Sequence, residues 1–492
     1  MEAIQSGFTA VILAAGEGTR MKSAHPKVVH EVLGQPMVCW VVDAARKAGA
    51  TRIVVVVGNG ADEVEALFAG SPDVECVMQS ERLGTGHAVK VAIESARIFD
   101  GRVLVLCGDT PLLKASTLSS LVKAAADPSC KGGTLLTMTY DDPTGYGRVM
   151  CKNDMMAYRI IEQKDCTPEQ AKWNVCNAGV YCFDAQQLHI HIGDLTCSNS
   201  QHEFYLTDMI ELLYNAGTPM KPFRIPDADE LMGVNSRIQL AEANKTMQKR
   251  INNQLMAQGV SMLDPDQVWV GPNVTIGKDT MLLPGTMLMG YTSIGTECLI
   301  GPQTRLTNTK VGDFCTVDET VADQATIGNY VSCGPRAYLR PGAVLMDGSK
   351  AGTHVEIKKS VIGPKSKVPH LSYIGDCTIG SNVNIGAGTI TCNYNGKFKN
   401  PTTIGDNSFI GSDTMLVAPV NVGSDCTIGA GSVITKDVPN GSLSLERTEQ
   451  RIVEGWLPRW ARKEREPEPE VSQEQETAPA PAEENKSETM SE

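Results

Sequence analysis

Two hydrophobic patterns divide the chain. From Phe8 to about Leu231, short apolar runs such as TAVILAAG, RIVVVVG and RVLVLCGD alternate with helix-like segments such as PMVCWVVDAARKAGA. This alternation predicts a Rossmann-like α/β domain with a mainly parallel sheet. Ligands of such sheets bind at the carboxyl ends of the strands. We therefore expect a site in the loops after Leu13, Val57 and Cys107.

A helix is predicted to follow this domain. Residues 236–258, SRIQLAEANKTMQKRINNQLMAQ, lack Pro and Gly and are rich in good helix formers. We therefore expect a first domain over residues 1–232, a linker helix over 233–258 and a second domain over 259–456.

Beyond residue 262 the apolar residues recur at every sixth position. Three such ladders run from Val270 to Leu306, from Val321 to Leu345 and from Ile404 to Ile434. A six-residue step, often with Gly after the aliphatic residue as in IGKD, IGTE and IGNY, is typical of a left-handed parallel β-helix. Each coil of that fold is a triangular turn of three short strands, and we expect Gly or Asn to adopt the positive φ of the corners. Residues 391–402, TCNYNGKFKNPT, interrupt the ladder and are expected to form a loop outside the prism.

Composition limits the classes of protein to which the chain can belong. With 41% hydrophobic and 21% charged residues and no apolar run that could span a bilayer, it is typical of soluble globular proteins. Residues 464–492 carry −8 of the net charge of −13, within a Pro- and Glu-rich tail over 457–492 that is expected to be disordered. The remainder is mildly acidic and lacks a basic footprint for nucleic acid or an anionic membrane. The 15 Cys form no CxxC pair and no export signal is apparent, which favours a cytoplasmic protein with reduced thiols and no structural metal.

A Gly-rich turn after the first strand carries the first candidate chemistry. The strand TAVIL runs into AAGEGTRM, and Lys27 follows. Gly16 and Gly18 let backbone N–H groups approach phosphate oxygens, while Arg20 and Lys27 can neutralise the charge on an α-phosphate under attack. The turn lacks both GK[ST] and GxGxxG spacing, so it is neither a Walker loop nor a dinucleotide fingerprint.

Further motifs follow this turn in order: QSERLGTGHA at 79–88, GDTPL at 108–112, GYGRV at 145–149, IIEQKD at 160–165, NAGV at 177–180 and GVNSR at 233–237. Together with LAAGEGTRMKSAHPKVVHEVLGQPM they closely resemble the signature of sugar-1-phosphate nucleotidyltransferases, in the uridylyltransferase branch. The resemblance implies that UTP is bound by Leu13, Ala14, Ala15, Gly16, Lys27, Gln79, Gly84 and Thr85.

The same resemblance implies the remaining roles in this domain. N-acetylglucosamine 1-phosphate would be bound by Gly147, Glu162, Asn177 and Asn235. Asp109 and Asn235 would hold Mg²⁺ against the triphosphate, and Arg20 and Lys27 would stabilise the transition state. Positioning and charge compensation suffice for such a transfer, without a protein nucleophile. The family commonly has NTG where this chain has NAG, so Ala178 removes one hydroxyl contact to the sugar.

Polar segments interrupt the aliphatic ladders: LRPGA at 339–343, HVEIKKS at 354–360, PHLSYIGD at 369–376 and NVNIGAGTITCNYNG at 382–396. They closely resemble the acetyltransferase half of the bifunctional enzymes that acetylate glucosamine 1-phosphate and then uridylylate the product to UDP-N-acetylglucosamine. The resemblance extends from residue 8 to about 456. It implies a homotrimer through the β-helix, with the acetyltransferase sites between subunits.

Acetyl transfer to an amine needs a base and a donor for the developing oxyanion. His370 suits the base, since imidazole titrates near neutral pH. The resemblance implies that the sugar phosphate is bound by Arg340, Lys358, Tyr373 and Asn384. It implies that acetyl-CoA is bound by Ala387, Asn393, Tyr394, Ser412, Ala430 and Arg447. Pro369 stands where the family usually has Gly, and Pro fixes φ and removes an N–H next to His370.

Two alternatives to a bifunctional enzyme remain open. In a single-activity nucleotidyltransferase, as in the ADP-glucose and mannose pathways, the β-helix would serve only oligomerisation or regulation. A non-catalytic trimeric scaffold would tolerate the loss of Lys27, Asp109 or Asn235, which are all present. Cys392 could carry an acyl group, but no partnered His supports this, and we interpret it as a packing residue.

Overall fold

The computed structural model describes residues 7–152, 155–199 and 201–462. The chain forms two compact units, Met1–Glu446 and Arg447–Glu492. In the second unit the described residues include a short helix, α8 (Arg459–Arg462). Most of the tail expected over 457–492 lies outside the described residues. In the part of the chain that is described, no helix is both long enough and apolar enough to cross a bilayer.

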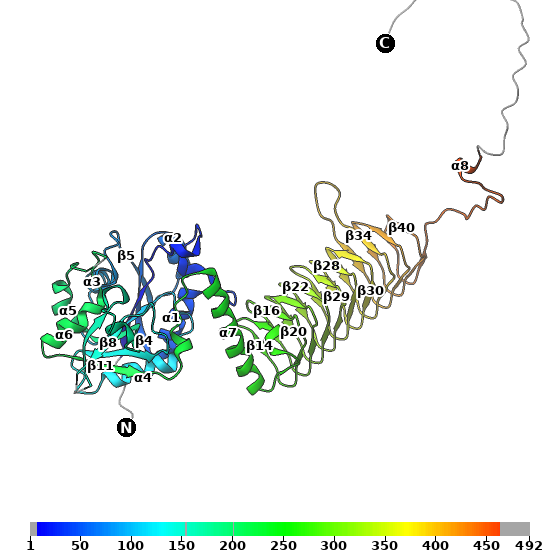
Figure 1. Ribbon diagram of the computed structural model, residues 1–492. Helices are drawn as coiled ribbons and strands as arrows, with labels where there is room; N and C mark the ends of the chain where they lie inside the picture. The colour runs from blue at the N-terminus through cyan, green and yellow to red at the C-terminus, as the bar shows by residue number, and fades with distance from the viewer. Residues whose placement is uncertain (1–6, 153–154, 200, 463–492) are drawn as a thin grey trace, which may run out of the picture. The chain divides into compact units, whose positions relative to one another are not determined.

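The first part of the chain folds around a mixed sheet (Figure 1). Its strands lie in the order β5 (Val74–Met78), β4 (Ala50–Val57), β1 (Phe8–Leu13), β6 (Arg102–Cys107), β10 (Val175–Asp184), β7 (Gly133–Thr139), β11 (Met220–Arg224), β9 (Ala157–Ile161) and β8 (Arg148–Cys151). β1 is parallel to β4 and β6, and β4 is parallel to β5, whereas β10 is antiparallel to β6 and β7. The predicted α/β domain is confirmed.

Helices cover both faces of this sheet. They are α1 (Met37–Ala48), α2 (Ala61–Leu67), α3 (Thr85–Ser95), α4 (Ala115–Ala125), α5 (Ala185–His191) and α6 (Met209–Asn215). Alternate residues of β4 enter two separate cores, because successive side chains of a strand point to opposite faces. Val55 shares its core with Val41 of α1, whereas Val54 shares the other core with Val89 of α3. Burial on both faces explains why β4 reads as a continuous apolar run.

The helix α7 (Arg237–Ala257) lies where the sequence predicts the linker helix. The hydroxyl of Ser236 caps it by accepting a hydrogen bond from the backbone N–H of Gln239 at 3.3 Å. At its other end, the amide groups of Gln248 and Asn252 donate to the carbonyl oxygen of Val268 at 2.7 and 2.9 Å. The helix is thereby fastened to the first coil of the second half. The domain boundaries themselves stay a prediction.

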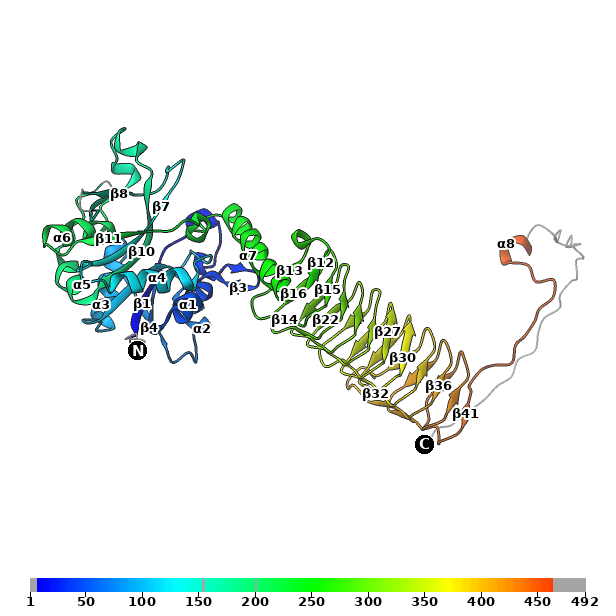
Figure 2. The same ribbon diagram turned by 90° about the horizontal axis from the view of Figure 1, so that it is seen from below.

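From residue 261 to residue 444, a stretch that is described throughout, the chain winds through three parallel sheets (Figure 2). One runs from β12 (Ser261–Met262) to β41 (Leu443–Ser444), the next from β13 (Trp269–Val270) to β40 (Val433–Ile434) and the third from β14 (Thr275–Ile276) to β38 (Val420–Val422). Successive strands belong to different sheets, and each pairs in register with the strand one coil later. This is the predicted left-handed parallel β-helix.

The predicted ladders identify the inward positions with one error. The residues of the first and third ladders are buried or nearly so. The prediction is wrong at Val321, which is half-buried on the outside, while its neighbour Ala322 pairs with Leu306 and faces the core. The inward positions here are Leu306, Val311, Val317 and Ala322, so some sides of the prism are one residue shorter than six. A strict six-residue count therefore slips out of register.

Positive φ occurs as predicted at Gly and Asn corners, among them Gly342 (φ 81°), Asn382 (φ 56°) and Asn407 (φ 57°). The Gly that directly follows the aliphatic residue in IGKD, IGTE and IGNY does not have positive φ and serves close packing instead. Gly277 and Gly295 do not have positive φ. A Cβ on Gly277 would lie 2.6 Å from the carbonyl carbon of Gly295, and one on Gly295 would lie 2.6 Å from that of Gly312. Many corners with positive φ are held by other residues, including Phe314 (φ 58°) and Tyr330 (φ 55°). Gly is thus required where successive coils touch.

Two candidate active sites

A cavity of about 530 Å³ opens at the carboxyl ends of β1, β5 and β6. It is lined by Leu13, Ala14, Ala15, Gly16, Glu17, Lys27, Val28, Gln79, Arg82, Gly84, Thr85, Ala88, Cys107, Asp109 and Glu203. All the residues that the resemblance assigns to UTP therefore share one cavity. The loop after Val57 does not line it; its Gly58 packs beneath the turn, where a Cβ would lie 2.9 Å from the carbonyl oxygen of Ala15.

The ammonium group of Lys27 lies between the two predicted metal ligands. It donates to the carboxylate of Asp109 in a short ion pair and to Oδ1 of Asn235 at 2.9 Å. The side chains of Lys27 and Asp109 are only 13% and 16% exposed. The backbone N–H of Val234 donates to the carbonyl oxygen of Asp109 at 2.9 Å, so the loops that carry the two ligands are joined. Two oxygens that converge on a cation fit Mg²⁺, which prefers oxygen ligands.

The Gly-rich turn lets this lysine approach. Gly18 has φ 63°, and a Cβ there would lie 2.6 Å from Cβ of Lys27. Around Gly16, by contrast, nothing lies within 4 Å of a Cβ. The turn is therefore open toward the cavity and closely packed on the side of Lys27.

The predicted uridine-binding residues Gln79, Gly84 and Thr85 belong to a loop that is held by packing and hydrogen bonds. The amide of Gln79 donates to the carbonyl oxygen of Gly84 at 3.3 Å, and the hydroxyl of Thr85 accepts from the N–H of Leu206 at 3.1 Å. A Cβ on Gly84 would lie 2.7 Å from the carbonyl oxygen of Phe204. The loop over residues 79–85 thus rests on the segment over 203–206.

The structure does not bring Arg20 into the cavity. Arg20 is exposed in a 3₁₀ turn (Thr19–Met21). Arg82 lines the cavity instead and forms a short ion pair with Glu17. Sequence reasoning missed Glu17, Arg82 and Glu203. The first two lie inside the motifs EGTR and QSERLG and could have been considered there, whereas Glu203 comes from a segment without a recognisable motif.

Three of the four predicted sugar-phosphate residues, Gly147, Glu162 and Asn177, meet where β8, β9 and β10 lie together, whereas Asn235 contacts Lys27. The N–H of Asn177 donates to the carbonyl oxygen of Gly147 at 2.8 Å, and a Cβ on Gly147 would lie 3.4 Å from Oε2 of Glu162. The carboxylate of Glu162 accepts from the hydroxyl of Thr207 at 3.2 Å, and burial raises the pKa of Glu162. The side-chain amide of Asn177 donates to the hydroxyl of Tyr181 at 2.7 Å. Their roles in sugar binding stay a prediction.

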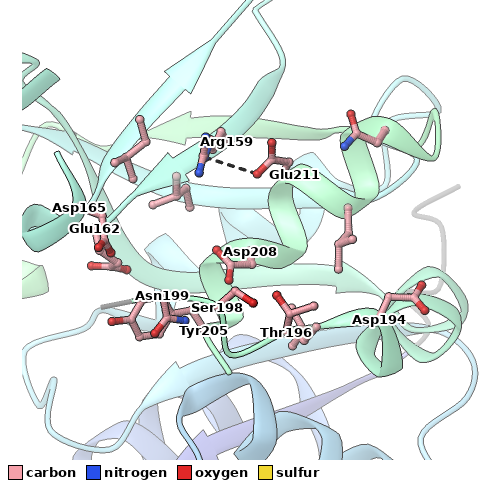
Figure 3. A pocket seen from close by; sticks show the side chains of 15 residues that line it. Arg159, Glu162, Asp165, Asp194, Thr196, Ser198, Asn199, Tyr205, Asp208 and Glu211 are labelled. Atoms are coloured by element: carbon pink, nitrogen blue, oxygen red, sulfur yellow. Dashed lines mark ion pairs between the residues drawn. The ribbon is translucent and has the colours of Figure 1, made fainter. Parts of the chain in front are cut away.

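A second cavity of about 500 Å³ lies next to Glu162 (Figure 3). Its charged side chains are Arg159, Glu162, Asp165, Asp194, Asp208 and Glu211. Arg159 pairs with Glu211 at 3.4 Å, and burial raises the pKa of Asp208. Carboxylates accept hydrogen bonds from hydroxyl groups and repel phosphates. This side of the site therefore suits the hydroxyl-rich part of a sugar.

Arg148 organises the loops beside the predicted sugar site. Its side chain is 1% exposed and donates to Oε1 of Gln163 at 2.7 Å, to the carbonyl oxygen of Ala171 at 2.9 Å and to that of Tyr146. Its Nε is buried without a partner, and the guanidinium makes no ion pair with a described carboxylate. A buried cation with only neutral partners is costly, so the hydrogen bonds by which Arg148 joins Tyr146 to Gln163 and Ala171 have to be kept.

In the β-helix, the strand register places the predicted base in one row with predicted acetyl-CoA residues. Registered partners in successive coils are Lys367, Asn384, Phe409 and Thr427. The residues three positions further along are His370, Ala387, Ser412 and Ala430. Because in-register strands stack their flanking corners, these four residues form a row along one corner of the prism. His370, Ser412 and Ala430 are exposed in the single chain.

Of the predicted sugar-phosphate residues of the second site, Lys358 and Tyr373 lie on the adjoining sheet and Arg340 follows a strand of it, whereas Asn384 lies on the sheet that carries His370. Glu356 and Lys358 of β28 (Glu356–Lys358) are in register with Tyr373 and Gly375 of β31 (Tyr373–Gly375). Arg340 pairs with Glu356 at 2.8 Å. The ammonium of Lys358 lowers the pKa of Lys399. Sequence reasoning missed Lys399 because this residue lies in the irregular loop. Two ammonium groups held this close together attract an anion.

The loop over residues 393–401 projects beside β34 (Ile390–Cys392) (Figure 1). Asn393 is 6% exposed, and its amide donates to the carboxylate of Asp376 at 2.6 Å, whereas Tyr394 is 60% exposed. Asn393 therefore anchors the loop and Tyr394 is presented by it. Arg447 is exposed and begins the second unit. The roles of all three toward acetyl-CoA stay predictions.

The Pro before the predicted base does not interrupt its strand. β30 (Lys367–His370) contains Pro369, and the pairs on either side of it, Ala351 with Val368 and Thr353 with His370, keep the parallel register. The position of His370 is therefore set by strand pairing.

Comparisons with known proteins agree with the two halves. The family described as MobA-like NTP transferase domain matches residues 10–154, and the hexapeptide repeat of succinyl-transferase matches residues 401–436. The bifunctional protein GlmU of Pelobacter propionicus is 46% identical over 455 residues, covering 92% of this chain and 99% of the relative. The bifunctional protein GlmU of Heliobacterium modesticaldum is 47% identical over 452 residues, covering 92% and 98%.

Proposed function

The chain belongs to the family of bifunctional GlmU proteins, and on that basis we propose how its residues divide two transfer reactions between two sites. It is an N-acetylglucosamine-1-phosphate uridylyltransferase and a glucosamine-1-phosphate N-acetyltransferase. The observation that carries the assignment is that Asp109 and Asn235 converge on Lys27, and that Lys27 and Asp109 line the cavity that the proposed UTP residues also line.

In the uridylyl site, the proposed reaction is an in-line displacement. A phosphate oxygen of N-acetylglucosamine 1-phosphate attacks the α-phosphorus of UTP, the new P–O bond forms, and the bond to pyrophosphate breaks. The Gly-rich turn offers backbone N–H groups, Gln79 and Thr85 orient the uridine, and Glu162 holds the sugar. Lys27 compensates charge on the α-phosphate, which is the main requirement of such a transfer.

We propose Asp109 and Asn235 as the Mg²⁺ ligands of this site. Their oxygens already converge on the ammonium of Lys27, and a carboxylate with an amide oxygen fits the oxygen preference of the ion. When bound, Mg²⁺ supplies positive charge to the triphosphate. Arg20, which is exposed outside the cavity, has weaker structural support as a transition-state residue than Lys27.

In the acetyl site, the proposed reaction is direct transfer from acetyl-CoA. The amine of glucosamine 1-phosphate attacks the thioester carbonyl, the C–S bond breaks, and His370 takes the proton that the amine loses. Arg340 and Lys358 hold the sugar phosphate, with Tyr373 and Asn384 on the sugar. Ala387, Ser412 and Ala430, in the same row as His370, line the acetyl-CoA channel with Asn393, Tyr394 and Arg447.

This second site supports a homotrimer as the active form. His370 and its row are exposed in a single chain, so a neighbouring β-helix has to enclose them if water is to be excluded from the reaction. We also propose a cytoplasmic location, where acetyl-CoA and UTP are available and the 15 cysteines stay reduced.

The test is to separate the two half-reactions. Purified enzyme receives glucosamine 1-phosphate and acetyl-CoA in one assay, which measures free CoA, and UTP, Mg²⁺ and N-acetylglucosamine 1-phosphate in the other, which measures pyrophosphate. Asp109→Ala should lose only pyrophosphate release, and His370→Ala should lose only CoA release, each by at least about a hundredfold.

The design distinguishes this proposal from its rivals. If the wild type releases pyrophosphate but no CoA, the protein is a single-activity nucleotidyltransferase with an oligomerising β-helix. If it does neither, the protein is a scaffold. A variant of one site that abolishes both activities while the protein remains folded contradicts separate sites.

A further inference from the structure

An ion pair joins two sides of the uridylyl cavity. Glu17 belongs to the Gly-rich turn after β1, and Arg82 belongs to the loop between β5 and α3. The guanidinium of Arg82 and the carboxylate of Glu17 are in direct contact, and both residues line the cavity. Their side chains are 41% and 57% exposed, so the pair lies at the opening.

The charges of the cavity do not fit its proposed ligand. Its acidic lining residues are Glu17, Asp109 and Glu203, and its basic ones are Lys27 and Arg82. Lys27 is already paired with Asp109. A triphosphate adds several negative charges to a cavity that is itself slightly acidic. Even when Mg²⁺ offsets part of this charge, nucleotide binding is favoured if a cation of the lining exchanges its carboxylate partner for a phosphate, and Arg82 is the cation that is paired at the mouth.

We propose that Arg82 is a binding residue for the UTP phosphates and that Glu17 restrains it until the nucleotide arrives. The inference rests on the proposed uridylyltransferase function. A guanidinium binds phosphate oxygens with two parallel hydrogen bonds, and such contacts are stronger than its exposed pair with a carboxylate. Glu17 adjoins Gly16, whose neighbourhood is open toward the cavity, so a guanidinium beside Glu17 is already next to the proposed phosphate site.

The two members of the pair therefore have opposite effects. Removing the guanidinium takes away a phosphate contact. Removing the carboxylate frees Arg82 and also removes a negative charge from the phosphate site. A pair whose only role is to hold two loops together behaves differently, because the loss of either member then weakens binding in the same way.

The experiment measures UTP binding by isothermal titration calorimetry on the full-length protein in Mg²⁺ buffer. Arg82→Gln should weaken binding about tenfold, and Glu17→Gln should strengthen it about threefold, as expected for charge-assisted contacts at a partly exposed site. In the Arg82→Gln background the gain from Glu17→Gln should be smaller than in the wild type, because only the removal of the negative charge then remains. The matched control is the pair Arg52–Glu75, at 2.6 Å and with side chains 42% and 45% exposed, which does not line the cavity.

The outcomes are decisive. If Glu17→Gln weakens UTP binding as Arg82→Gln does, or if neither variant differs from the control variants Arg52→Gln and Glu75→Gln, the proposal is overturned. If the folded wild type does not bind UTP, the proposed function of the domain fails, which is a separate result. Raising the salt concentration should reduce the difference between Glu17→Gln and wild type, because exposed charges are screened.

Discussion

Replacing Lys27 by Met should increase the affinity of the nucleotide-free protein for a divalent cation. In the structure the ammonium of Lys27 occupies the position between the carboxylate of Asp109 and the amide oxygen of Asn235. An incoming metal ion has to displace it. Lys27→Met removes the competitor and leaves both oxygens in place, since their loops are joined by the hydrogen bond from Val234 to the Asp109 carbonyl.

The size of the effect follows from the contacts that are lost. A charged hydrogen-bonded pair whose side chains are mostly buried is worth about 1.5 to 3 kcal/mol. Since 1.4 kcal/mol corresponds to a factor of ten, Lys27→Met should bind the metal about ten- to a hundredfold more tightly. The same variant should lose uridylyl transfer, because it lacks the cation that we propose to face the α-phosphate.

Titration with Mn²⁺, followed by electron paramagnetic resonance of the free ion, measures this affinity without turnover. Lys22→Met is the control, because Lys22 is exposed in the neighbouring turn. Combining Lys27→Met with Asp109→Asn should abolish the gain. If folded Lys27→Met protein binds Mn²⁺ no more tightly than wild type, then the ammonium does not occupy the metal position and the assignment of Asp109 and Asn235 is refuted.

Three further predictions concern stability and the sugar site. Burial raises the pKa of Glu162, so its protonated form contributes stability below the ordinary carboxylate pKa, and this contribution is lost as the pH rises through the raised value. In differential scanning calorimetry, Glu162→Gln should therefore have a higher Tm than wild type at pH 7.5 but not at pH 4. An equal gain at both pH values contradicts this. Gly277→Ala should lower the free energy of unfolding by about 1 to 3 kcal/mol, because the new Cβ clashes with Gly295. A Cβ on Gly193 would have no atom within 4 Å, so Gly193→Ala should melt like wild type. In steady-state kinetics Arg148→Lys should raise KM for the sugar phosphate about tenfold and leave KM for UTP unchanged; equal rises in both would show a general loss of folding.

The fold was predictable because both halves repeat a pattern that burial imposes on the sequence. The inward position of each prism side must be apolar, and the six-residue step records this directly. The slip at Val321 was not predictable from a fixed period, because shorter sides change the count and only strand pairing shows that Ala322 is opposite Leu306. The sequence showed that Gly often follows the inward aliphatic residue. It did not show why Gly is needed there, because the close contact between successive coils appears only in three dimensions.

For the uridylyl site, the sequence predicted most of the residues that take part but not how their side chains are arranged. The ordered motifs identified the residues that line the uridylyl cavity. They could not reveal that Arg82 lines the cavity while Arg20 does not, because the position of a side chain in a turn depends on the packing around it. Glu203 reaches the cavity only because residues 203–206 pack against the 79–85 loop, a contact that no local pattern records.

In-register pairing of the coils also determines how the β-helix can change in length. Ile276 pairs with Ile294, so excising residues 277–294 removes one complete coil and rejoins two equivalent positions. Every remaining aliphatic residue would keep its neighbours above and below, and the prism would shorten by about 4.8 Å, one inter-strand spacing. A deletion that does not end on a registered partner would rotate the following faces out of alignment. The size of a whole coil also differs along the prism: Lys310 pairs with Thr326 and Thr326 with Val344. Duplication or loss of whole coils, each counted from its own strand register, is therefore the route by which relatives can acquire longer or shorter prisms with their chemistry intact.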